Sequence, residues 1–126
     1  MDINDLSYLS QILHKSEALK EILDQEFSAL KQQDLEIFEK LQIQKAQILE
    51  FLSNEDFLTN AEKYRKNRTS PEEELSISLE SLEIWDRIIK VMAEGKKLHQ
   101  RNEVLINSKL ESIRNALRTI QTPDPL

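Results

Sequence analysis

The side chains in this sequence that could hold a metal ion or move a proton are two histidines, His14 and His99, and 23 aspartates and glutamates. A di-iron site in a helical bundle needs a glutamate three residues before each of two histidines. Those two positions hold Gln11 and Lys96 in this chain. The spacing of the histidines and acids does not match a zinc site either. We therefore predict no metal site and no cofactor.

The motifs that support nucleophilic catalysis or phosphate binding are also missing. The chain has no cysteine and a single glycine. It therefore lacks a thiolate nucleophile, and it cannot form a glycine-rich phosphate loop or a nucleophile elbow. The sequence predicts no catalytic residues and a protein that is not an enzyme.

Length and charge limit the remaining classes of function. The 126 residues suffice for one domain, expected over residues 1–121, and the formal net charge is −6. A negative surface disfavours nucleic acid as a partner. The chain has no apolar run near the roughly 18 residues that span a membrane, and its acidic start lacks the basic region of a secretory signal. We expect a cytoplasmic protein that does not insert into membranes.

Apolar residues at alternating spacings of four and three predict a first long helix over residues 3–53. The stripe starts at Leu9 and ends at Phe51, with no glycine or proline between them. The run Gln32-Gln33-Asp34 is where this helix could end, with Asp34 as the N-cap of a new helix. Because the apolar phase passes through Asp34 unchanged, we expect one continuous helix.

Local signals divide the rest of the chain. Asn54 is expected to cap a short helix over residues 55–67. Ser70, Pro71 and Glu73 form a capping box with proline at the first helical position, which predicts a second long helix over residues 71–121 and leaves a frayed tail over 122–126. The expected fold class is all-α, an antiparallel bundle or helical hairpin of two long helices plus a short connecting helix.

Antiparallel pairing would bring together residues whose numbers sum to roughly 120–130. It would place Lys96 and His99 near Glu26, and Asp34 near residues 88–96. We therefore predict a polar layer at mid-bundle, of the kind that fixes register in coiled coils. Splayed helices whose polar side chains meet water are an equally compatible alternative. The predicted layer consists of Glu26, Asp34, Lys96 and His99.

The last third of the chain has more apolar residues than one helical seam requires. If the facing segment, residues 3–19, covers only half of them, an apolar groove remains in which an amphipathic helix of another protein can dock. The alternative is an ordinary bundle core. The predicted partner-binding residues of this stripe are Leu105, Ile106, Leu110, Ile113, Leu117 and Ile120.

Two segments of the chain together resemble the FlgN family of flagellar type III export chaperones. The first is EFSALKQQDLEIFEKLQIQKAQILEFL, residues 26–52, and the second is LHQRNEVLINSKLESIRNALRTI, residues 98–120. The sequence differs from the family at His99 and Glu103, where members often have asparagine and glycine. The residues that carry the resemblance are Glu26, Ala29, Leu30, Asp34, Leu41, Lys45, Leu49, Leu52, Asn102, Leu105, Ile106, Ala116 and Leu117.

The resemblance implies binding rather than catalysis. Members of this family hold the C-terminal helical segments of hook-associated junction proteins, keep them soluble and deliver them to the flagellar export apparatus. The resemblance adds Asn102 to the partner-binding residues and implies a protein that is monomeric when free. A structural or self-associating coiled-coil protein without a secreted client is the alternative.

Overall fold

The computed structural model describes residues 3–69 and 77–121, and in these two ranges every regular element is an α-helix. The all-α class is thus confirmed. The predicted capping box at residues 70–73 and the tail at 122–126 lie outside the described residues. The helices are α1 (Ile3–Gln32), α2 (Leu35–Leu52), α3 (Glu55–Thr69) and α4 (Leu79–Gln121).

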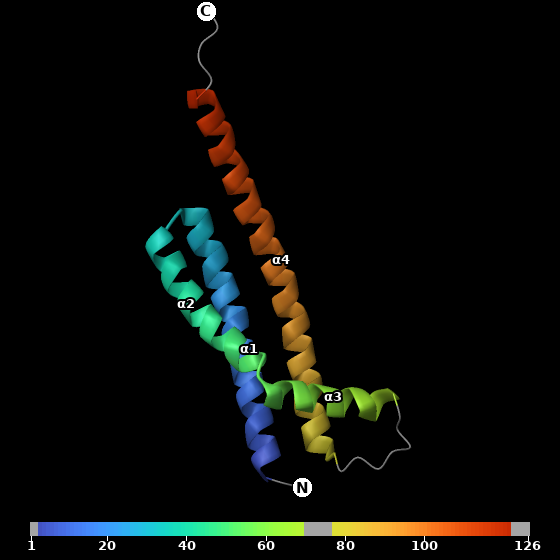
Figure 1. Ribbon diagram of the computed structural model, residues 1–126. Coiled ribbons are helices and arrows are strands. Elements are labelled where there is room, and N and C mark those ends of the chain that lie inside the picture. The colour runs from blue at the N-terminus through green and yellow to red at the C-terminus, as the bar shows by residue number, and fades with distance from the viewer. Residues whose placement is uncertain (1–2, 70–76, 122–126) are drawn as a thin grey trace, which may run out of the picture.

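The helix α1 is the centre of the fold, because it packs against both α2 and α4. α1 and α2 form an antiparallel hairpin, and α3 runs crosswise at the base of this hairpin (Figure 1). With 43 residues against 30, α4 is about 65 Å long and α1 about 45 Å. α4 therefore continues well beyond the tip of the hairpin (Figure 1).

The core surrounds α1 and confirms its predicted apolar stripe. Leu9, Leu23 and Leu30 of the stripe are buried, and so are Ile12 and Ile22 beside them. The other three helices cover these residues with the buried side chains of Leu41, Ile48, Leu52, Tyr64, Trp85 and Ile88.

The first helix does not run on to residue 53, so that prediction is wrong. Gln33 has a positive φ of 58°. The N–H groups of Gln33 and Asp34 donate back to the carbonyls of Leu30 (3.3 Å) and Ala29 (2.9 Å). These two bonds form a Schellman motif, which satisfies the last carbonyls of a helix and turns the chain away from its axis.

Asp34 then starts the next helix. Its carboxylate accepts a hydrogen bond from the N–H of Ile37 at 3.2 Å, as an N-cap does. The turn leaves the apolar phase unchanged, since Leu41 and Ile48 still face inward from α2. Periodicity in the sequence therefore gave no sign of the break.

The long helices α1 and α4 run parallel, and the predicted antiparallel pairing is wrong for them. Ion pairs join Glu17 to Arg87 and Asp24 to Arg101, so the residue numbers rise together along both helices. The reason is the break after α1, because α2 returns the chain to the base and α4 then starts at the same end as α1 (Figure 1).

Asn54 ties the connection after α2 to the first helix. Its Oδ1 accepts hydrogen bonds from the N–H of Phe57 (2.9 Å) and the hydroxyl of Tyr8 (3.1 Å). It caps α3 as the sequence predicted, although α3 ends two residues later than expected. The ring of Tyr64 stacks on Trp85 of α4, with centroids 4.8 Å apart. α3 is therefore fixed to both α1 and α4 at the base.

The helix α4 starts later than the sequence predicted. Ile77 and Ser78 are not helical, and the Oγ of Ser78 accepts a hydrogen bond from the N–H of Ser81 at 3.1 Å. Ser78 therefore caps a helix that begins at Leu79, and the prediction of one helix running unbroken through residues 77 and 78 is wrong.

Candidate functional site

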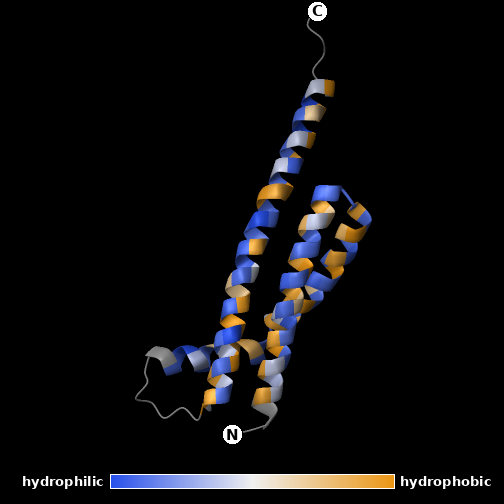
Figure 2. Cartoon of the chain, turned by 180° about the vertical axis from the view of Figure 1, so that it is seen from behind, coloured by the Kyte–Doolittle hydropathy of each residue, from blue (hydrophilic) through white to orange (hydrophobic). Residues whose placement is uncertain are grey.

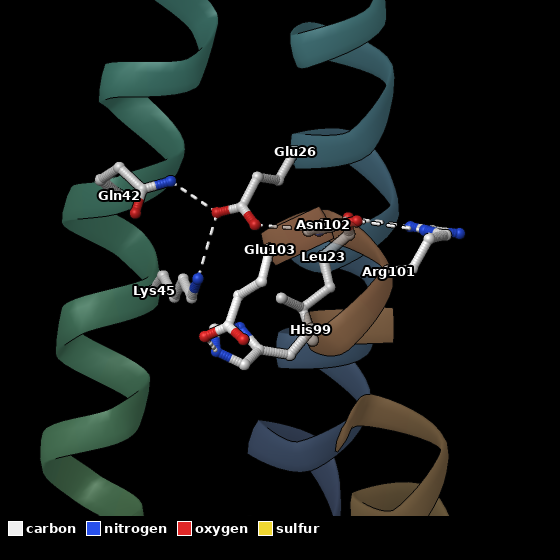
Figure 3. A network of polar contacts seen from close by, with 8 residues as sticks. All are labelled: Leu23, Glu26, Gln42, Lys45, His99, Arg101, Asn102 and Glu103. Carbon is white, nitrogen blue, oxygen red and sulfur yellow. Dashed lines mark hydrogen bonds and ion pairs between the residues drawn. The ribbon is translucent and has the colours of Figure 1, made fainter. Parts of the chain in front are cut away.

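One buried carboxylate joins three helices at the middle of the molecule. Glu26 of α1 is 1% exposed. Its Oε2 accepts hydrogen bonds from Nε2 of Gln42 (2.6 Å) and Nζ of Lys45 (3.2 Å), both on α2. Its Oε1 accepts one from Nδ2 of Asn102 on α4 at 2.9 Å (Figure 3). The carboxylate thus fixes the register of α2 and of α4 along α1.

Asn102 is fully buried and extends this network to the surface. Its Nδ2 also donates to the carbonyl of Leu23 (2.8 Å), and its Oδ1 accepts from Nε of Arg101 (3.1 Å). The guanidinium of Arg101 pairs with Asp24 at 3.3 Å and lies over the ring of Phe27 at 3.8 Å. Among the described residues, every buried side-chain nitrogen or oxygen has a hydrogen-bond partner.

The network keeps Glu26 ionised. Burial acts to raise the pKa of the Glu26 carboxyl, because charge is unfavourable away from water. The hydrogen bonds that the carboxylate accepts and the positive charge of Lys45 outweigh burial, so its pKa lies below the ordinary value of 4.5. The group acts as a structural anion, with each oxygen already committed to donors of the same chain.

Of the four residues predicted to form the polar layer, the structure places only Glu26 in this network. Asp34 caps the start of α2, and the side chains bonded to Glu26 are those of Gln42, Lys45 and Asn102 instead. His99 pairs with Glu103 on its own helix (3.0 Å), and both are turned away from the carboxylate in Figure 3. Lys96 is exposed. The antiparallel register behind these assignments does not exist in the fold.

The partners that sequence reasoning missed are Gln42, Lys45 and Asn102. Gln42 and Lys45 are three residues apart on α2, so they share one face of that helix. Their position opposite Glu26 follows from the turn at Gln33, which the apolar pattern did not show. Asn102, which the resemblance placed among partner-binding residues, is buried inside the chain and is not available to a partner in this structure.

An apolar cavity of about 370 Å³ lies beside the polar layer, between α1, α2 and α4. Its walls include Leu23, Leu49 and Met92, and Lys96 and His99 also line it. These two residues of the predicted layer therefore line a groove and do not bond to Glu26.

A second apolar groove, of about 550 Å³, lies at the tip of the hairpin where α4 passes it. We call it the tip groove. It takes residues from the end of α1, the start of α2 and the C-terminal half of α4. The apolar residues that line it are Ala29, Leu30, Leu35, Phe38, Ile106, Leu110 and Ile113.

From the tip groove onward, α4 carries a row of large apolar side chains that remain exposed, which we call the overhang stripe. Its members are Leu110, Ile113, Leu117 and Ile120, which are 44%, 56%, 47% and 78% exposed. Leu110 and Ile113 also line the tip groove, and hydrophobic residues recur along α4 above the hairpin in Figure 2.

The predicted partner-binding residues therefore fall into two groups. Leu105 and Ile106 are half-buried near the hairpin, whereas the overhang stripe projects past it. The sequence predicts that residues 3–19 cover part of this region. Because α1 and α4 are parallel, those residues lie at the opposite end of the molecule, and the stripe is more exposed than predicted (Figure 1).

None of the helices in the described part of the chain combines the length and the apolar character that crossing a membrane requires. In residues 3–69 and 77–121, no group of three or more histidines and acids is arranged to hold a metal ion.

Comparison of the chain with protein-family models, with curated proteins and with solved structures gave no match. The resemblance to the FlgN family therefore rests on the two segments quoted above.

Proposed function

We propose that this protein is a cytoplasmic type III flagellar export chaperone. It binds the C-terminal helical segments of hook-associated junction proteins, keeps them soluble and delivers them to the export apparatus. The observation that carries the helix-binding part of the proposal is the overhang stripe.

The spacing of the overhang stripe is that of a helix seam without its second helix. Its members follow each other at intervals of three, four and three residues, which keeps them on one face of α4. Full burial of such a side chain contributes about 1.5–3 kcal/mol, and these are already partly covered, so a docked helix gains about 1 kcal/mol from each. An amphipathic helix is the partner that matches a row of this shape.

The tip groove extends this surface toward the hairpin. Leu110 and Ile113 belong to both the groove and the stripe. A helix lying on the stripe can therefore also place a side chain between α4 and residues such as Phe38 of α2. This continuity favours a partner that follows α4 over one that touches its end alone.

The flagellar part of the proposal is supported by the residues that carry the resemblance. Glu26 belongs to the first of the two segments and Asn102 to the second, and these two residues are hydrogen-bonded to each other at 2.9 Å. Each segment thus supplies one residue of the same buried hydrogen-bonded pair. The pairing gives a structural reason for the two segments to occur together in one chain.

The test is retention of purified C-terminal fragments of hook-associated junction proteins on the immobilised full-length protein. Leu117→Asp places a charge within the stripe, and Asn115→Asp places the same charge on the opposite face of α4. We expect the wild type and Asn115→Asp to retain the fragments and Leu117→Asp to lose them, while circular dichroism shows equal helix content for all three. Failure of the wild type to retain any fragment would overturn the proposal.

The same stripe also fits a self-associating coiled-coil protein without a client. Sedimentation velocity separates the two functions. A chaperone sediments as a monomer when free, whereas a structural coiled coil forms a dimer that Leu117→Asp dissociates. A dimer of that kind, with no retained fragment, would favour the second function.

A further inference from the structure

The end of α4 is basic although the whole chain is acidic. Residues 104–121 contain three cations and one acid, in a protein whose net charge is −6. Lys109 and Arg114 are two of these cations. Within residues 3–69 and 77–121, no carboxylate lies within ion-pairing distance of either one.

These two cations lie on either side of the overhang stripe. If Leu110 and Leu117 are a positions of a heptad and Ile113 and Ile120 are d positions, Lys109 is at g and Arg114 is at e. Side chains at e and g border the seam and face the e and g positions of a partner helix. The surface offered to a partner is thus an apolar row with a positive charge on each side.

A second copy of this chain is a poor occupant of such a surface. Parallel pairing of two stripes would set Lys109 of one copy against Arg114 of the other, since g faces the e position five residues on. Antiparallel pairing centred on the stripe would bring the two Arg114 side chains together. Like charges in these positions oppose association.

A lipid surface is also disfavoured as the occupant. The stripe is a single narrow row without an aromatic residue, whereas helices that lie on membranes commonly use tryptophan or phenylalanine on a broad apolar face. The tip groove beside the stripe is shaped by two further helices, which suits a side chain of a protein partner.

We propose that the occupant of the overhang stripe is an amphipathic helix of another protein that carries aspartate or glutamate in the two rows beside its apolar seam. This inference rests on the docking part of the proposed function and adds the charge of the client. The positive charges beside the stripe would let the protein select acidic helices, although its own net charge is negative.

The probes are two synthetic peptides of three heptads, both with leucine at a and d. One peptide has glutamate at every e and g position, and the other has lysine there. Binding of each labelled peptide to the full-length protein is measured by fluorescence anisotropy at low salt. We expect the glutamate peptide to bind about five- to tenfold more tightly, which is the size of effect that two exposed ion pairs provide.

Two double variants test the position of the charges. Lys109→Glu with Arg114→Glu reverses both flanks of the stripe and should reverse the preference, so that the lysine peptide binds better. Lys90→Glu with Lys97→Glu makes the same change in net charge on α4 below the overhang, and should keep the preference for the glutamate peptide. Added salt should weaken the preferred complex in both cases.

Other outcomes would overturn the inference. If both peptides bind equally, or if neither binds, the proposal that the client carries acidic residues beside its seam is wrong. If in addition junction-protein fragments are still retained through Leu117, the proposed function stands and only the charge of the client is refuted. A wild-type dimer that excludes the peptides would make a second copy the occupant. Binding to phosphatidylglycerol vesicles that Leu117→Asp abolishes, without peptide binding, would make the occupant a membrane.

Discussion

The amide of Asn102 on α4 donates a hydrogen bond to the carboxylate of Glu26 on α1 across 2.9 Å, and both side chains are buried. The apolar seam between two parallel helices can slip by a turn and still bury similar area. A single buried polar pair has only one register in which it is satisfied. This pair therefore fixes how far α4 projects past the hairpin, and with it the extent of the overhang stripe.

Replacement of Glu26 by glutamine should destabilise the protein by about 3–5 kcal/mol, because Lys45 then lies mostly buried without its counter-charge. The measurement is urea denaturation followed by circular dichroism. Glu21→Gln, an exposed change on the same helix, is the control and should stay within about 0.5 kcal/mol of the wild type. Equal unfolding midpoints for both variants would show that the polar layer contributes nothing.

The same carboxylate predicts how stability depends on pH. The pKa of Glu26 in the folded protein lies below its ordinary value of 4.5, so its contribution is complete above that value. The contribution is lost as pH falls from 4.5 through the lower pKa of the folded state. The wild type should therefore lose stability in this range more steeply than Glu26→Gln.

The readout is the difference in unfolding free energy between the wild type and Glu26→Gln, measured by urea denaturation in a series of acidic buffers. Comparing the two proteins removes the contributions of Glu62 and Glu94, whose pKa values are also lowered, since they are common to both. The difference should shrink toward low pH. A constant difference would mean that the pKa of Glu26 is the same in the folded and the unfolded protein.

Truncation of Leu41 to alanine should cost about 2–5 kcal/mol, the usual range for a buried leucine. Leu41 is 5% exposed and packs α2 against the first helix. Ile43→Ala on the same helix is the control, because Ile43 is 64% exposed, and thermal unfolding of the two variants gives the comparison. A similar melting temperature for both would contradict the packing of α2.

Several features of this fold could be predicted from the sequence because they depend on local chemistry. Helix periodicity gave the all-α class, and the asparagine at position 54 gave the start of α3. Each of these depends on residues within a few turns of one another. Glu26 was placed in the predicted polar layer by an antiparallel register of the long helices, which the fold does not have.

The arrangement of the helices could not be predicted, because it depends on one turn with a weak signal. A Schellman turn usually has glycine at its left-handed position, and here the residue is Gln33. Without this turn, the sequence predicts that α4 runs antiparallel to α1, which would place Lys96 and His99 beside Glu26. The residues bonded to Glu26 are Gln42, Lys45 and Asn102.

Replacement of Gln33 by glycine tests that turn through the sign of its effect. A residue with a side chain at φ 58° is strained, and glycine is not, so Gln33→Gly should stabilise the protein by about 0.5–1 kcal/mol. In a continuous helix the same change would cost about 1 kcal/mol, because glycine is a poor helix former. Gln33→Ala is the control, since alanine also has a Cβ atom and is strained at this φ. It should therefore not show the gain in stability expected for glycine. Urea denaturation of the three proteins decides between the two structures. A lower unfolding midpoint for the glycine variant than for the alanine variant would mean that α1 and α2 are one helix. The parallel course of α4 would then lose its physical basis.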